Sequence, residues 1–107
     1  MIEQSKFIDM IKILDECLTV MSREAFHSDQ ESLLEVNDLI FNLKDHKSEL
    51  DLILQIDLAD KRNSFNIAIN NTTPVTSSNL IAGIAADAYA DAENTVQRVK
   101  TFLRKKI

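Results

Sequence analysis

Carboxylates are the residues of this 107-residue sequence with the clearest potential for chemistry. Four of them, Glu31, Glu35, Asp38 and Asp45, share one helix face with Asn42 between the last two, because the steps are four, three, four and three residues. General acid–base catalysis needs two carboxylates in different environments across a cleft, whereas these are sequential neighbours on a solvated surface. The spacing therefore predicts an acidic stripe that binds a basic partner, or else a plainly solvated face.

A second, smaller acidic group lies near the C-terminus. Asp87 and Asp91 are one helical turn apart and flank Tyr89, the only tyrosine. Tyrosine is enriched at binding hot spots because its ring supplies contact area and its hydroxyl supplies a hydrogen bond. We expect this group to anchor a lysine or arginine of a partner. The alternative is a tyrosine partly buried in the core.

Other kinds of site find little support in the composition. A lone glycine, Gly83, cannot build a glycine-rich phosphate loop or a dinucleotide fingerprint. Cys17 falls on an apolar helix stripe, where burial raises a thiol pKa and suppresses nucleophilic attack. His27 and His46 lie at opposite ends of a predicted helix, too far apart to share a metal. We expect no enzyme activity, no cofactor and no metal site.

Charge is distributed unevenly along the chain. Residues 1–60 hold 14 acidic and 5 basic side chains, whereas residues 61–107 hold 3 and 7. Nucleic-acid binding normally needs a basic face that displaces counterions. The balance instead favours a basic protein approaching the acidic half, with no nucleic acid as partner.

Targeting signals are not evident. A single cysteine cannot form an internal disulfide, and charged residues interrupt the apolar stretch at residues 7–14. The longest uncharged stretch, residues 63–86, is rich in Asn, Thr and Ser and is too polar to cross a membrane. These features predict a cytoplasmic protein with no membrane role.

Apolar residues at helical spacing predict the helices that carry these residues. Apolar side chains recur at helical spacing over residues 5–24 and again from Ser28, which forms a predicted capping box with Glu31. The second helix is expected to end near residues 45–46. A third is expected from Ser48 toward Phe65, and the last starts at Ser77 or Ser78 after a loop at residues 70–79.

The fold class predicted from these segments is all-α, an antiparallel bundle of about four helices in one domain spanning residues 1–107. One glycine and one proline leave little material for tight turns. Residues 52–58 and 65–69 also alternate with the period of strands, so an α+β fold with a hairpin at about 52–69 is the competing prediction.

In size, acidity and helical content the chain resembles the small bacterial immunity proteins that accompany contact-dependent growth-inhibition toxins and some bacteriocins. The resemblance implies a protein that binds one cognate toxin, often a basic nuclease, and blocks its active site without chemistry. Acidic side chains suit that task because they imitate phosphates and accelerate encounter. The alternative is a structural or adaptor bundle that self-associates, as a homodimer for instance, through its alanine-rich last helix.

Overall fold

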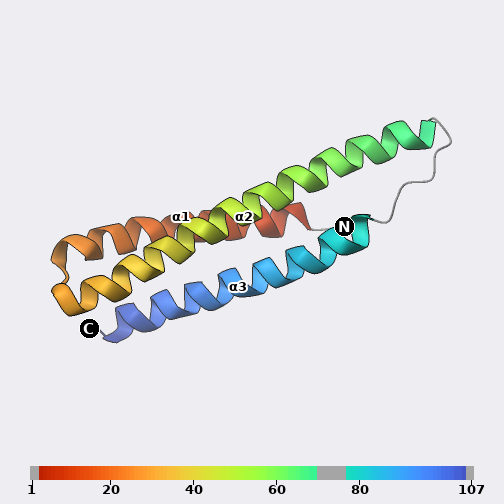
Figure 1. Ribbon diagram of the computed structural model, residues 1–107. Coiled ribbons are helices and arrows are strands. Elements are labelled where there is room, and N and C mark those ends of the chain that lie inside the picture. The colour runs from red at the N-terminus through yellow and green to blue at the C-terminus, as the bar shows by residue number, and fades with distance from the viewer. Residues whose placement is uncertain (1–2, 70–76, 106–107) are drawn as a thin grey trace.

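Three helices make up the described part of the chain. The computed structural model describes residues 3–69 and 77–105, and describes side chains over 3–59 and 82–105. The helices are α1 (Gln4–His27), α2 (Gln30–Ile69) and α3 (Ser77–Lys105) (Figure 1). The all-α prediction is confirmed for these residues, which contain no strand, and the hairpin at 52–69 is wrong because α2 runs through it. Of the predicted loop, residues 70–76 lie outside the described residues and 77–79 belong to α3.

The helices form an elongated up-down-up bundle measuring 61 × 19 × 18 Å. Figure 1 shows α2 running antiparallel to α1, and α3 returning antiparallel to α2. At ~1.5 Å per residue, the 40 residues of α2 span about 60 Å, which is the full length of the molecule. The C-terminal end of α2 therefore extends beyond α1 (Figure 1).

The turn between α1 and α2 differs in detail from the predicted capping box. Asp29 is the N-cap of α2, since its Oδ1 accepts a hydrogen bond of 2.8 Å from the backbone N–H of Ser32. The Ser28 hydroxyl instead donates to the Glu24 carbonyl oxygen, 2.6 Å away, at the end of α1. The second helix thus begins at Gln30, one capping residue later than predicted.

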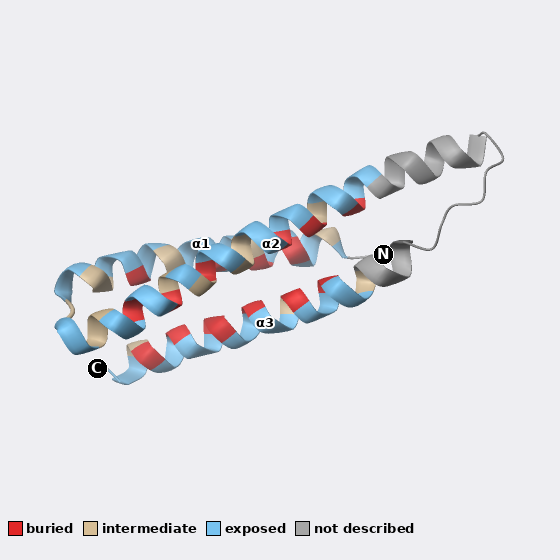
Figure 2. Ribbon diagram, in the orientation of Figure 1, coloured by how far each residue is buried: buried red, intermediate tan, exposed pale blue. Residues whose placement is uncertain are grey.

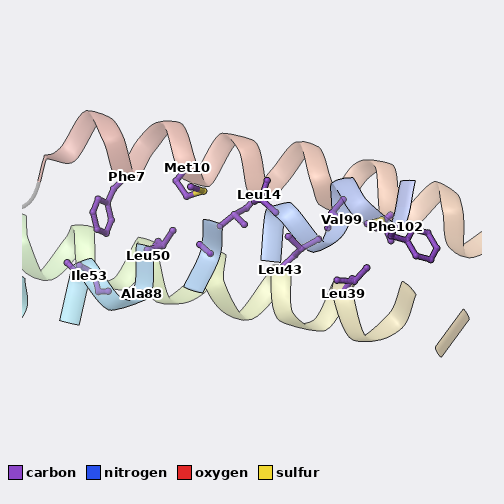
Figure 3. Packing of buried hydrophobic residues seen from close by; sticks show 14 of the residues in the cluster. Phe7, Met10, Leu14, Leu39, Leu43, Leu50, Ile53, Ala88, Val99 and Phe102 are labelled. Carbon is purple, nitrogen blue, oxygen red and sulfur yellow. The ribbon is translucent and has the colours of Figure 1, made fainter. Parts of the chain in front are cut away.

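Buried residues recur at steps of three, four or seven residues on each helix (Figure 2), and their side chains meet between the helices (Figure 3). This is the pattern of coiled-coil-like packing, in which a narrow seam faces the neighbouring helices. The seam residues include Phe7, Met10, Leu14 and Met21 of α1, Val36, Leu39, Leu43, Leu50 and Ile53 of α2, and Ala85, Ala88, Ala92, Val96, Val99 and Phe102 of α3.

The predicted break in α2 near residues 45–48 is wrong, so the described residues form three helices and not four. The heptad repeat continues through the segment as Leu43, His46, Leu50, Ile53 and Asp57. His46 and Asp57 are polar residues at positions that are otherwise apolar, and a polar residue at a seam position looks like an interruption in the sequence. No Gly or Pro lies in this segment to end the helix.

Candidate protein-binding surface

Polar residues within the seam pair across helices. The Nε2 atom of His46 on α2 lies 2.8 Å from the Thr95 Oγ1 atom on α3. The buried Asp57 carboxylate accepts a hydrogen bond of 3.1 Å from the Gln4 side-chain amide of α1. A polar group at a seam position can fix the register of packed helices, because sliding would leave it buried without a partner. These two contacts therefore anchor α2 against both neighbours.

His46 was expected to be a solvated histidine at a helix end, and that prediction is wrong. It lies in the middle of α2 and is half-buried, whereas His27 is exposed as the last residue of α1. The contact with Thr95 shows that His46 joins α2 to α3. Its position in the heptad repeat is the sequence signal that could have predicted its place in the seam.

We expect neutral His46 to carry its proton on Nε2. The Thr95 hydroxyl donates to the Asp91 carbonyl oxygen at 3.2 Å, so its oxygen is left to accept the proton of Nε2. Nδ1 is buried and has no hydrogen-bond partner in the structure, which suits an unprotonated nitrogen. Long-range ¹H–¹⁵N NMR at a pH where the imidazole is neutral distinguishes the tautomers. A proton found on Nδ1 would contradict this hydrogen-bond direction.

The predicted acidic stripe of α2 is exposed at all four carboxylates: Glu31, Glu35, Asp38 and Asp45. Asp38 is engaged within the chain, since its Oδ2 lies 3.0 Å from Nη2 of Arg98 on α3 and 3.4 Å from the Asn42 side-chain amide. Both members of the ion pair are at least half exposed, so the pair stabilises the fold only weakly. The Asp38–Arg98 pair shows which side of α2 faces α3.

The ion pair also shows that the two predicted acidic groups lie on the same side of the bundle. Asp87, Asp91 and Arg98 share one face of α3, as Asp38, Asp45 and Glu49 share one face of α2. Antiparallel helices rise at the same rate, and Asp45 and Asp91 each lie seven residues from the Asp38–Arg98 contact. The His46–Thr95 contact gives a register that differs from this one by five residues, so the two contacts together place Asp91 across from residues 45–50 of α2 and Asp87 across from residues 49–54.

We call Asp45, Glu49, Asp87 and Asp91 the acidic face. All four are exposed, and none forms an ion pair with a described residue. The same two contacts place Lys105 across from residues 31–36 of α2, at the opposite end of the two rows. Basic residues of α3 thus approach the Glu31 end of the stripe, and the uncompensated negative charge is concentrated nearer the middle of the bundle. Glu49 was missed because the predicted break at residues 45–48 separated it from the stripe.

Tyr89 does not belong to this surface. It is two residues from both Asp87 and Asp91, so it projects from the other side of α3. It is half-buried against α1, with its ring centroid 5.7 Å from that of Phe7 and the Lys6 Nζ atom 4.7 Å above its ring. The alternative of a partly buried tyrosine fits this environment, and the cation that Tyr89 contacts is the protein's own.

Two surface hollows lie beside α1. The first lies between α1 and α3 and is lined by Glu3, Lys6, Phe7, Ala82, Ala85, Ala86 and Tyr89. The second lies between α1 and α2, where Lys47 pairs with Asp15 at 2.6 Å and Ser48 has no histidine among its neighbours in the hollow. No described histidine or cysteine lines either hollow, so neither contains a Ser–His or Cys–His pair.

The remaining groups with potential chemistry are Cys17 and the possible metal ligands. Cys17 is half-buried, and burial raises the pKa of its thiol, an effect that the positive charge of Lys100 partly offsets. The thiol therefore stays protonated and weakly nucleophilic at neutral pH. Among the described residues, no three His, Cys, Asp or Glu side chains are grouped to hold a metal ion.

No helix in the described part of the chain combines the length and apolar character needed to cross a membrane.

No protein-family model matches the chain, and no curated protein or solved structure shows significant similarity to it.

Proposed function

We propose that this protein binds a basic partner protein through the acidic face, without catalysis. The observation that carries the proposal is the juxtaposition of Asp45 and Glu49 with Asp91 and Asp87, four exposed carboxylates with no ion-pair partner among the described residues. Like charges on facing helices repel, and a cationic partner relieves that repulsion while it gains attraction of its own. The summed field also accelerates encounter with a basic protein.

Toxin immunity, which the resemblance in size, charge and helicity implies, is the specific form of this proposal that we favour. A rigid bundle with preformed acidic residues suits a protein that occludes the active site of a basic nuclease. The cognate toxin is then the partner, and the protein contributes no reacting group.

Self-association through the alanine-rich part of α3 finds less support. Ala85, Ala88 and Ala92, which would permit close approach of another helix, are already buried against α1 and α2. A two-fold symmetric contact through the acidic face would also bring like charges together. Both observations favour a different protein as the partner.

Reversing two charges of the acidic face should abolish most of the binding. We expect Asp45→Lys combined with Asp91→Lys to weaken the complex at least about tenfold, because each change turns attraction for a basic partner into repulsion. These positions are preferable to Asp38, whose reversal would also break the Arg98 ion pair. The wild-type complex should associate more slowly as salt rises, since exposed charges are screened over about 8 Å at physiological ionic strength.

The matched control is Asp9→Lys combined with Glu16→Lys, which makes the same charge change on exposed positions of α1. The partner is captured from lysate of the natural host on wild-type protein, identified, and then measured against all three proteins by biolayer interferometry. A partner that binds the Asp45/Asp91 variant as tightly as the control contradicts the proposal. For the immunity form, expression of the partner alone should arrest growth, and co-expression of wild-type protein should restore it.

A further inference from the structure

Large apolar side chains also project from the outer face of α2, away from the core. Leu34, Phe41 and Leu52 are 76%, 70% and 58% exposed. They are separated by seven and eleven residues, so they lie on one helix face, and the seam of α2 lies on the other side. Asp38 and Asp45 lie beside this row, on its side toward α3. We call Leu34, Phe41 and Leu52 the anchor row.

Isolated exposed apolar residues are ordinary on protein surfaces, but their arrangement here is periodic. The row continues along α2 beside the acidic face, which includes Asp45 and Glu49. A partner lying on α2 would therefore meet apolar side chains along its centre and carboxylates along one edge. Aromatic and aliphatic anchors beside complementary charge are the usual composition of a binding hot spot.

We propose that the anchor row docks an amphipathic helix of the basic partner, with lysine or arginine on the flank of that helix that faces Asp45 and Glu49. The inference rests on the proposed function, since it names the element by which the basic partner binds. At ~1.5 Å per residue, Phe41 lies about 10.5 Å from Leu34 and about 16.5 Å from Leu52 along the helix, which matches seven and eleven residues of a second helix.

An extended segment fits the row less well. Side chains on one face of a strand repeat every ~6.7 Å, so neither spacing is a whole number of repeats. The α2 backbone is hydrogen-bonded within its helix and offers no free edge for strand addition. The spacing therefore selects a helix.

A second copy of this chain is a poor occupant. An antiparallel pairing that brings Leu34 of one copy against Leu52 of the other also sets Phe41 against Asp45. A parallel pairing sets Asp38 against Asp38 and Asp45 against Asp45. The first sets a carboxylate beside an aromatic ring and the second places like charges in contact, and neither brings lysine or arginine to Asp45 as a basic helix does.

The test uses a synthetic probe helix of about three heptads, with leucine at positions a and d and lysine at e and g. Titrated into the full ¹⁵N-labelled chain, it should shift amide resonances over residues 34–52 and bind at least tenfold more tightly than a scrambled peptide of the same composition. Phe41→Gln should weaken binding about tenfold, and Leu34→Gln should act in the same direction. The control Ile13→Gln, at an apolar position of α1 that is 40% exposed, should bind as wild type does.

The outcomes separate this inference from the proposed function. If Asp45→Lys with Asp91→Lys weakens binding of the natural partner while Phe41→Gln and Leu34→Gln do not, the acidic face is the site and the anchor row is not. If the charge reversal has no effect on that partner, the proposed function fails, and the inference about the anchor row fails with it. If sedimentation shows a wild-type dimer that Phe41→Gln dissociates, the occupant is a second copy and the inference is overturned.

Discussion

Replacing Ser48 with proline should lower the free energy of unfolding by about 3 kcal/mol or more. Ser48 is exposed on the surface of α2, so the change removes no core contact. Proline instead deletes the hydrogen bond from residue 48 to the Lys44 carbonyl oxygen, and its ring clashes with that carbonyl. Because α2 is continuous here, both effects act in full. Urea denaturation followed by circular dichroism measures the loss.

This experiment separates a three-helix bundle from a four-helix bundle. If a helix began at Ser48, as its capping potential suggests, proline there would be tolerated, since the first turn of a helix has no intrahelical N–H bonds to lose. Ser48→Ala is the control, and it should be neutral or slightly stabilising because alanine is the better helix former. A Ser48→Pro protein as stable as Ser48→Ala would contradict a continuous α2.

Leu14→Ala should destabilise the protein by about 2–4 kcal/mol, because it leaves a cavity in the seam that α2 and α3 can fill only partly. Leu14 is 0% exposed and lies among the buried residues of all three helices (Figure 3). A domain of this size has only about 5–15 kcal/mol of total stability, so the loss is a large share. The midpoint of urea denaturation should fall with little change in slope.

The adjacent residue supplies the control for the Leu14 experiment. Ile13 is 40% exposed on the flank of α1, so Ile13→Ala removes a similar number of carbon atoms from a position that water already reaches. We expect a change below about 1 kcal/mol. Equal losses for the two variants would mean that the α1 stripe does not face the core.

The Ser48 substitution also connects the fold to binding. Ser48 lies between Asp45 and Glu49 of the acidic face and between Phe41 and Leu52 of the anchor row. A kink at this point would change the direction of one half of each surface relative to the other. The straight course of α2 therefore positions the proposed binding residues as well as stabilising the bundle.

Periodicity in the sequence determined the helical class and most of the faces that became buried. Phe7, Leu14 and Met21, at helical spacing within the predicted helix at residues 5–24, are buried, and so are Val96 and Val99 of α3. The exposure of Glu31, Glu35, Asp38 and Asp45 also followed from their spacing. Such features depend on the helix that carries them, because 3.6 residues per turn decides which side chains share a face.

Contacts between helices decided the polar pairs within the seam and the relative placement of the acidic residues. The polar residues His46 and Asp57 in the α2 seam have Thr95 and Gln4 as partners, and these partners lie 49 and 53 residues away along the chain. The placement of Asp91 beside the segment of α2 that holds Asp45 and Glu49 depends on the antiparallel register of α2 and α3. Spacing within one helix orients its side chains only about its own axis, whereas the neighbour and its register arise from packing between distant segments.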